Sequence, residues 1–135
     1  MQKIVLPLLA LGALASAGEA NIGIIRCEPQ LIYKCTVEKC EKIPVVNVDG
    51  SQHFEVDAAR KRLIGKIGEN EVDINNIASS LGDSDAFVYF GLKKDTADHW
   101  VMRIAKKSGK MAIASISGTG DSYTIFGTCS WEEKK

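Results

Sequence analysis

A short row of ionisable side chains near the middle of the chain could bind a metal ion. His53, Glu55 and Asp57 alternate with Phe54 and Val56, and alternate residues of a β-strand lie on the same face. Neutral imidazole and carboxylates are suitable ligands for zinc or manganese. No further ligand group completes a coordination shell at a recognisable spacing. We therefore interpret the row as the solvent-facing side of a strand, with a small hydrolase or metal-binding protein as the alternative.

Hydroxyl side chains gather near the C-terminus, where Ser115 and Ser117 could act as nucleophiles or binding groups. The sequence contains no Gly-x-Ser-x-Gly segment, and neither histidine can be assigned to a serine as its base. We predict that the protein is not an enzyme, needs no cofactor and holds no metal. Ser115 and Ser117 remain candidate binding residues, together with His53, Glu55 and Asp57.

Four cysteines could either bind a zinc ion or form two disulfides. Cys27, Cys35, Cys40 and Cys129 are not arranged in the paired Cys-x-x-Cys pattern of a zinc site. Disulfides are therefore the favoured interpretation, and four cysteines allow three pairings. Of these we favour Cys35 with Cys40, which would close the turn between them, and Cys27 with Cys129, which would join the first strand to the last.

The N-terminus has the features of a cleavable secretion signal. Lys3 precedes an apolar run from Ile4 to Ala15, which is too short to span a bilayer, and small residues follow at the positions a signal peptidase reads. We expect cleavage after Ala17 or Ala20, with an uncut membrane anchor as the alternative. The prediction is a signal peptide over 1–20 and one domain over 21–135, periplasmic or secreted, without membrane insertion after cleavage.

Apolar residues of the remaining chain recur mostly at every second position, as in strands that bury one face. Trp100, Met102 and Ile104 form one such set, and a second set comprises Tyr123, Ile125, Gly127 and Cys129. Turn signals separate the runs at Asp49–Ser51, Ala58–Lys61, Gly68–Asn70, Gly82–Asp85, Ser108–Gly109 and Gly118–Asp121. The best candidate for a helical turn is Ile74–Leu81. The sequence predicts an all-β fold, a small antiparallel barrel or sandwich of about seven or eight strands.

One predicted strand carries aromatic residues at both odd and even positions, and therefore on both of its faces. Phe87, Tyr89 and Phe90 lie within four consecutive positions. Such a run indicates a strand that is buried on two sides or covered by a loop. A ligand cavity in an open barrel is the alternative.

Charge gives no indication of a nucleic-acid partner. The chain has 17 basic and 17 acidic residues, and Lys3 and Glu19 fall within the predicted signal, so the remainder has 16 of each. A neutral chain has no long-range attraction for nucleic acid or anionic membrane. We expect the partner to be a protein or a cell-wall component, although the sequence does not identify it.

The cysteine pattern resembles that of uncharacterised small secreted proteins of Gram-negative bacteria. The shared features are Cys27-x7-Cys35-x4-Cys40, with Tyr33 and Pro44 beside them, and a terminal Phe126-Gly127-Thr128-Cys129. The resemblance implies a disulfide-stapled β fold in the periplasm and brings no catalytic residues.

A second likeness is to the periplasmic inhibitors of C-type lysozyme, which are small β-barrels. Tyr33-Lys34-Cys35 and Cys129 match their outline, and Ser115-Ile116-Ser117-Gly118 resembles the Ser-x-Ser-Gly of their active loop. In the inhibitors that motif precedes a Trp-x-Lys-Gly segment, whereas here Trp100 comes before it. The likeness implies inhibition of a cell-wall lytic enzyme as an alternative function.

Overall fold

The computed structural model describes residues 22–45, 52–93 and 95–133, and the strands found there account for most of this part of the chain. The predicted signal peptide and the predicted turn at 49–51 lie outside the described residues. The strands are β1 (Ile25–Cys35), β2 (Cys40–Ile43), β3 (Gln52–Asp57), β4 (Arg62–Ile67), β5 (Asn70–Gly82), β6 (Ala86–Lys93), β7 (Asp98–Ala105), β8 (Lys110–Ile116) and β9 (Ser122–Ser130).

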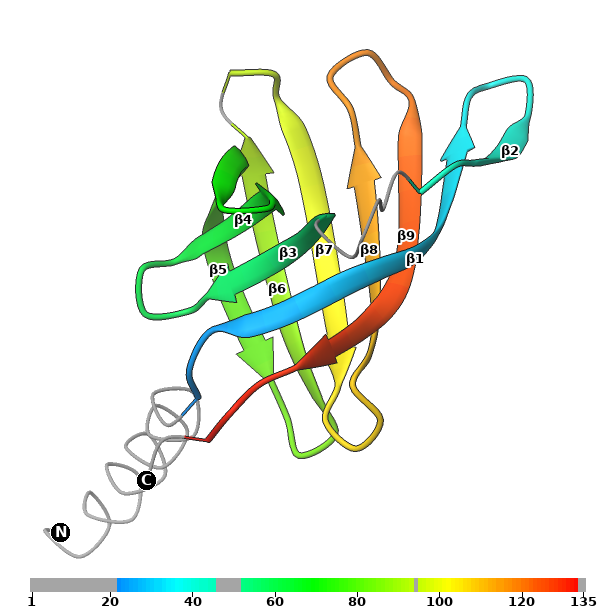
Figure 1. Ribbon diagram of the computed structural model, residues 1–135. Helices are drawn as coiled ribbons and strands as arrows, with labels where there is room; N and C mark the ends of the chain where they lie inside the picture. The colour runs from blue at the N-terminus through cyan, green and yellow to red at the C-terminus, as the bar shows by residue number, and fades with distance from the viewer. Residues whose placement is uncertain (1–21, 46–51, 94, 134–135) are drawn as a thin grey trace, which may run out of the picture.

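Eight of the strands form a closed antiparallel barrel. The order runs β1-β3-β4-β5-β6-β7-β8-β9, and pairing of β1 with β9 closes it (Figure 1). Closure removes the free edges that a row of short amphipathic strands would otherwise expose. The predicted all-β fold is confirmed, and of the two predicted architectures, barrel or sandwich, it is the barrel. A ninth strand, β2, is added as a short hairpin arm on the C-terminal half of β1.

The barrel interior is filled by the predicted inward-facing residues. Met102 and Ile104 have no exposed surface, and Trp100 and Tyr89 are also buried. An interior enclosed by eight strands is just wide enough for side chains to fill it. The apolar alternation in the sequence therefore corresponds to a core, to which Ile25, Val56, Leu63, Ile77, Phe87, Met111 and Ile113 also belong.

The predicted helical turn at 74–81 is wrong, because this segment lies within β5. The register between β5 and β6 shifts between Ile77 and Ser79, which marks a β-bulge. A bulge inserts one residue and reverses which positions face inward. Ile77 faces the core before the bulge and Leu81 faces outward after it, so their spacing of four does not mark a helical face.

The seam between β1 and β9 depends on a close approach of the two backbones. Gly127 is buried opposite Pro29. A Cβ atom at Gly127 would lie 2.0 Å from the carbonyl oxygen of Glu28. The glycine is therefore required for β1 and β9 to pair this closely.

Both predicted disulfide pairings are confirmed. Cys27 bonds to Cys129 across the β1–β9 seam, and Cys35 bonds to Cys40 across the β1–β2 hairpin. No cysteine is left free. Two disulfides indicate an oxidising compartment of the extracellular type. Within the described residues no helix is long and apolar enough to cross a membrane.

Candidate functional site

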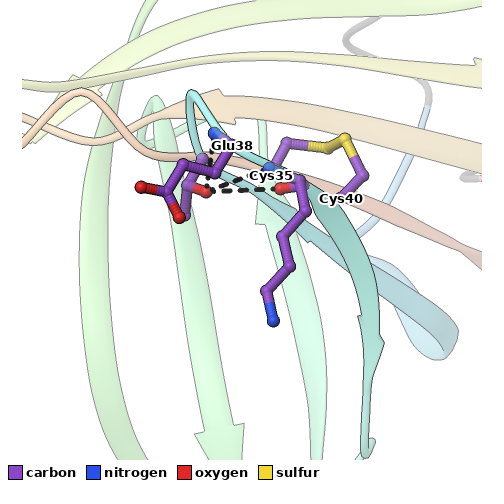
Figure 2. The surroundings of a disulfide bond; sticks show 5 residues. Cys35, Glu38 and Cys40 are labelled. Carbon is purple, nitrogen blue, oxygen red and sulfur yellow. Dashed lines mark hydrogen bonds between the residues drawn. A yellow bond between two sulfur atoms is a disulfide. The ribbon is translucent and has the colours of Figure 1, made fainter.

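The tip of the β1–β2 hairpin, residues Cys35–Cys40, is an exposed loop that both hydrogen bonds and a disulfide constrain. Thr36 organises it: its backbone N–H donates to the Lys39 carbonyl at 2.8 Å, and its Oγ1 accepts from the backbone N–H groups of Glu38 at 3.2 Å and Lys39 at 3.3 Å. The disulfide closes the base of the same loop (Figure 2). The hydrogen bonds of Thr36 and the Cys35–Cys40 disulfide thus fix the four residues 36–39, none of which belongs to the hydrophobic core.

The tip presents the apolar side chain of Val37 to solvent, where no other part of the described protein covers it. Val37 is 102% exposed, and Thr36, Glu38 and Lys39 are exposed as well. Figure 2 shows Glu38 on the side of the loop away from the sulfur atoms. Lys39 forms a weak ion pair with Glu41 at 3.6 Å. The arrangement is a rigid projection with a small aliphatic group between a threonine and a glutamate.

Neighbouring hairpins at the same end of the barrel are tied to one another. The β6–β7, β8–β9 and β1–β2 connections lie at this end (Figure 1). The backbone N–H of Gly118 in the β8–β9 turn donates to Asp98 Oδ1 at 2.9 Å, and Lys34 Nζ lies 3.8 Å from Asp121 Oδ2. The hydrogen bond from Gly118, assisted by Thr96, lowers the pKa of Asp98. The tip therefore projects from an end that is already ordered.

Ser115 and Ser117 do not converge on one site. Ser115 lies on the inward side of β8, in register with Trp100 and Tyr123, and is half-buried. Ser117 organises the β8–β9 turn: its Oγ lies 2.7 Å from Thr119 Oγ1 and accepts the Thr119 N–H at 3.1 Å. These contacts give Ser117 a structural role and leave it without a histidine base among its hydrogen-bond partners in the described structure.

The His53 row lies on the outward side of β3, opposite to Phe54 and Val56, yet its predicted solvation is wrong for His53. The His53 side chain is only 6% exposed, and its Nε2 lies 2.9 Å from Glu55 Oε2. The register places His53 beside Lys66. The Lys66 side chain is itself only 18% exposed, and its Nζ lies 3.7 Å from Glu71 Oε1.

The remaining carboxylate of the row has a different partner. Asp57 Oδ1 accepts the backbone N–H of Arg60 at 3.1 Å, and Asp57 Oδ2 lies 3.7 Å from the Arg60 side chain. Within the part of the chain that the structure describes, His53 Nδ1 is buried and has no hydrogen-bond partner. Among the described residues no three His, Cys, Asp or Glu side chains gather in a way that could hold a metal ion.

Hollows on the described surface are lined by both apolar and polar side chains. One of about 140 Å³ lies where β5 bulges outward, lined by Ala58, Lys61, Ile77 and Tyr89 among others. Another, of about 400 Å³, lies between the two ends of the described chain, beside Arg26 and Trp131. Ser79 and Ser80 also line the first hollow, and Ser130 and Glu132 line the second.

Comparison with known proteins yields no relative: no protein-family model matches the chain, no curated protein matches it, and no solved structure matches its fold. Geometry is therefore the main guide to function. Sequence reasoning treated the residues between Cys35 and Cys40 only as a turn and did not identify them as a site. The available signal was a valine between two closely spaced cysteines.

Proposed function

We propose that the protein is an exported binding protein that engages a protein partner through the tip of the β1–β2 hairpin. It would act in the periplasm or outside the cell after removal of residues 1–20. One observation carries the proposal: a disulfide holds a loop that stands outside the closed barrel and presents a fully exposed Val37.

The position of this disulfide argues for recognition. β2 pairs with β1 and is not one of the eight strands that close the barrel, so the Cys35–Cys40 bond does not hold the barrel together. A loop fixed in its bound conformation loses less conformational entropy on binding, which raises affinity. The bond and the Thr36 hydrogen bonds would prepare the tip for association in this way.

The exposed side chains indicate the kind of partner surface. An aliphatic side chain gives most binding energy when it fills a desolvated pocket. Glu38 and Lys39 on the same loop carry opposite charges. The partner would thus supply a shallow apolar pocket for Val37 with polar groups around it, as a cleft of a folded protein does.

Site-specific photo-crosslinking in the producing cell tests the proposal and captures a partner of any identity. Val37 is replaced by a photoreactive amino acid, and Ile67 is replaced in a matched control. Ile67 is an exposed β-branched residue at the β4–β5 turn. We expect a discrete adduct from position 37 and none from position 67. The absence of an adduct at position 37, or equal adducts at both positions, would contradict the proposal.

Inhibition of a lytic enzyme is a second candidate function, favoured by the position of the β8–β9 turn. Ser117 and Gly118 lie in this turn, at the same end of the barrel as the tip (Figure 1). The assay is turnover of cell walls by a C-type lysozyme with increasing amounts of the protein. Inhibition that is lost with Val37→Asp and retained with Ile67→Asp would support this candidate. Unchanged lysozyme activity would exclude it and leave the crosslinking test decisive for the broader proposal.

A further inference from the structure

The hollow beside the β5 bulge is a recess that combines a buried floor with polar edges, and we call it the β5 recess. Ile77 and Tyr89 are buried and form the floor. The volume is about 140 Å³, and an apolar protein cavity of about 150 Å³ is able to hold benzene. The recess is therefore large enough for a small organic molecule. Its lining consists of Ala58, Lys61, Ile77, Ala78, Ser79, Ser80 and Tyr89.

Strand pairing explains why the barrel is hollowed at this place. β5 pairs with β6 as far as Gly82, but its register with β4 ends at Asn76. The next main-chain bond on the β4 side is donated by the Ile77 N–H to the Lys61 carbonyl at 2.9 Å. Beyond it, the turn between β3 and β4 lies beside β5 in place of a paired strand. Side chains on this part of β5 can therefore reach solvent from the inner side of the barrel.

The bulge determines which polar groups of β5 line the recess. The register with β6 shifts between Ile77 and Ser79, which makes Ala78 the additional residue. Ser80 is in register with the buried Tyr89, so it lies on the inward side of the strand, and yet it is exposed. β-Bulges are frequent beside functional sites, where they redirect a side chain. Two adjacent hydroxyl groups thus lie at one edge of the recess.

Lys61 stands at the opposite edge in an unusual backbone conformation. Its φ of 57° lies in the left-handed region, which glycine adopts without the clash of a Cβ atom. Outliers of this kind cluster at ligand-binding and active sites. Within the described ranges Lys61 forms no ion pair, whereas its neighbour Arg60 pairs with Asp57. The Lys61 ammonium group is accordingly available to a bound anion.

Charge around the β5 recess also favours an anion. The turn carries Arg60, Lys61 and Arg62 in succession, and Asp57 is the acidic residue at its start. Asp57 already accepts the Arg60 N–H at 3.1 Å and lies 3.7 Å from the Arg60 side chain. A carboxylate accepts hydrogen bonds from ammonium and hydroxyl groups. Both kinds of donor line the recess, on Lys61 and on Ser79.

We infer that the β5 recess binds a small organic carboxylate, whose apolar part lies against Ile77 and whose carboxylate group lies toward Lys61. The two edges and the floor together select this class of ligand. An inorganic anion would leave the floor uncovered, and a neutral apolar molecule would leave the ammonium group without a partner. The inference is separate from the function proposed above, because the β3–β4 and β1–β2 hairpins lie on opposite sides of the barrel (Figure 1).

Titration of the oxidised protein with benzoate, followed by its amide chemical shifts, tests the inference. Benzoate joins a ring of the size of benzene to one carboxylate, and benzamide is a neutral molecule of nearly the same shape. We expect saturable shifts centred on the β5 bulge and the β3–β4 turn. Benzamide should bind about tenfold more weakly, as expected from the loss of one charge-assisted hydrogen bond.

Two variants and a control assign the interaction to the recess. Lys61→Gln keeps a long polar side chain and meets the same backbone conformation, and it should weaken benzoate binding about tenfold without changing that of benzamide. Ala78→Leu places a larger side chain at the recess and should weaken the binding of both molecules. Lys110→Gln removes an exposed lysine of β8 and should bind like the unmodified protein. Circular dichroism should show all three variants folded.

Three results would overturn the inference. The first is an absence of saturable shifts with benzoate, or shifts that map elsewhere on the barrel. The second is equal binding of benzoate and benzamide, because Lys61 would then contribute nothing. The third is binding of inorganic phosphate as tight as that of benzoate, because the floor of the recess would then play no part.

Discussion

The two disulfides are the same chemical bond in opposite surroundings. Cys27–Cys129 joins residues separated by 102 positions, lies within the barrel wall, and Cys27 is 0% exposed. Cys35–Cys40 joins residues separated by five positions and lies at an exposed hairpin. The first bond can hold the barrel closed, whereas the second can fix only a local loop. The long bond therefore serves the fold, whereas on the function proposed above the short bond would serve recognition.

The long bond should make the largest contribution to stability. Cys27→Ala with Cys129→Ala removes a loop closure of about one hundred residues, and we expect a loss of about 2 to 5 kcal/mol in the free energy of unfolding. Urea titration followed by tryptophan fluorescence measures it. A loss no larger than that of the Cys35→Ala, Cys40→Ala variant would remove the contrast between the two bonds.

A second change tests the same seam without touching a cysteine. Gly127→Ala forces a Cβ atom to within 2.0 Å of the Glu28 carbonyl oxygen, and backbone is less able to yield than a side chain. We expect destabilisation by about 3 kcal/mol, the upper end of the usual cost of overpacking. Gly68→Ala is the control, because Gly68 has open space and a φ of 60°; strain alone should cost it about 1 kcal/mol. Equal effects would show that the seam tolerates a side chain.

The short bond should matter less for unfolding. Cys35→Ala with Cys40→Ala opens a loop of only a few residues, and the chain-entropy relation assigns such a loop about 2 kcal/mol. We expect this value as an upper limit, since Thr36 hydrogen bonds also hold the tip. Thermal unfolding of this variant beside the long-bond variant gives the ranking. A larger loss than for the long bond would reverse our assignment of roles.

The smallest effect should come from the contact that links the turns beside the tip. The Gly118 N–H lowers the pKa of Asp98 below its ordinary value of 3.8. A lowered folded-state pKa stabilises the fold above the unfolded pKa, and this stabilisation is lost as pH falls through the folded value. Asp98→Asn should therefore flatten the fall in stability below pH 3.8. Unfolding measured across acid pH checks this, and an unchanged slope would contradict it.

Periodicity in the sequence predicts the barrel and its core. Strict alternation of Trp100, Met102 and Ile104 identifies the buried side of β7, because a strand has a period of two. Cys129 alternates with the outward residues of its strand, so it was expected to face inward. It lies opposite Cys27, and the predicted Cys27–Cys129 disulfide is correct. Barrel closure follows less directly, since local pattern cannot specify which distant strands meet.

The errors arise where neighbours in space override the pattern. The β5 bulge could not be recognised from the Ile77–Leu81 spacing, which mimics a helix. His53 lies on the outward side of β3 with Glu55 and Asp57, yet its side chain is only 6% exposed. Alternation within one strand does not show what covers its outward face. Phe90 lies on the outer face, so β6 is not buried on two sides as predicted.

The most direct test of the division of roles is crosslinking from position 37 in two backgrounds. The photoreactive residue replaces Val37 in the protein with both disulfides and in the Cys35→Ala, Cys40→Ala variant, both folded at the assay temperature. We predict that opening the short bond lowers adduct yield about tenfold, equivalent to about 1.4 kcal/mol of lost loop order. Equal yields from the two proteins would contradict this division, because the short disulfide would then make no contribution to recognition.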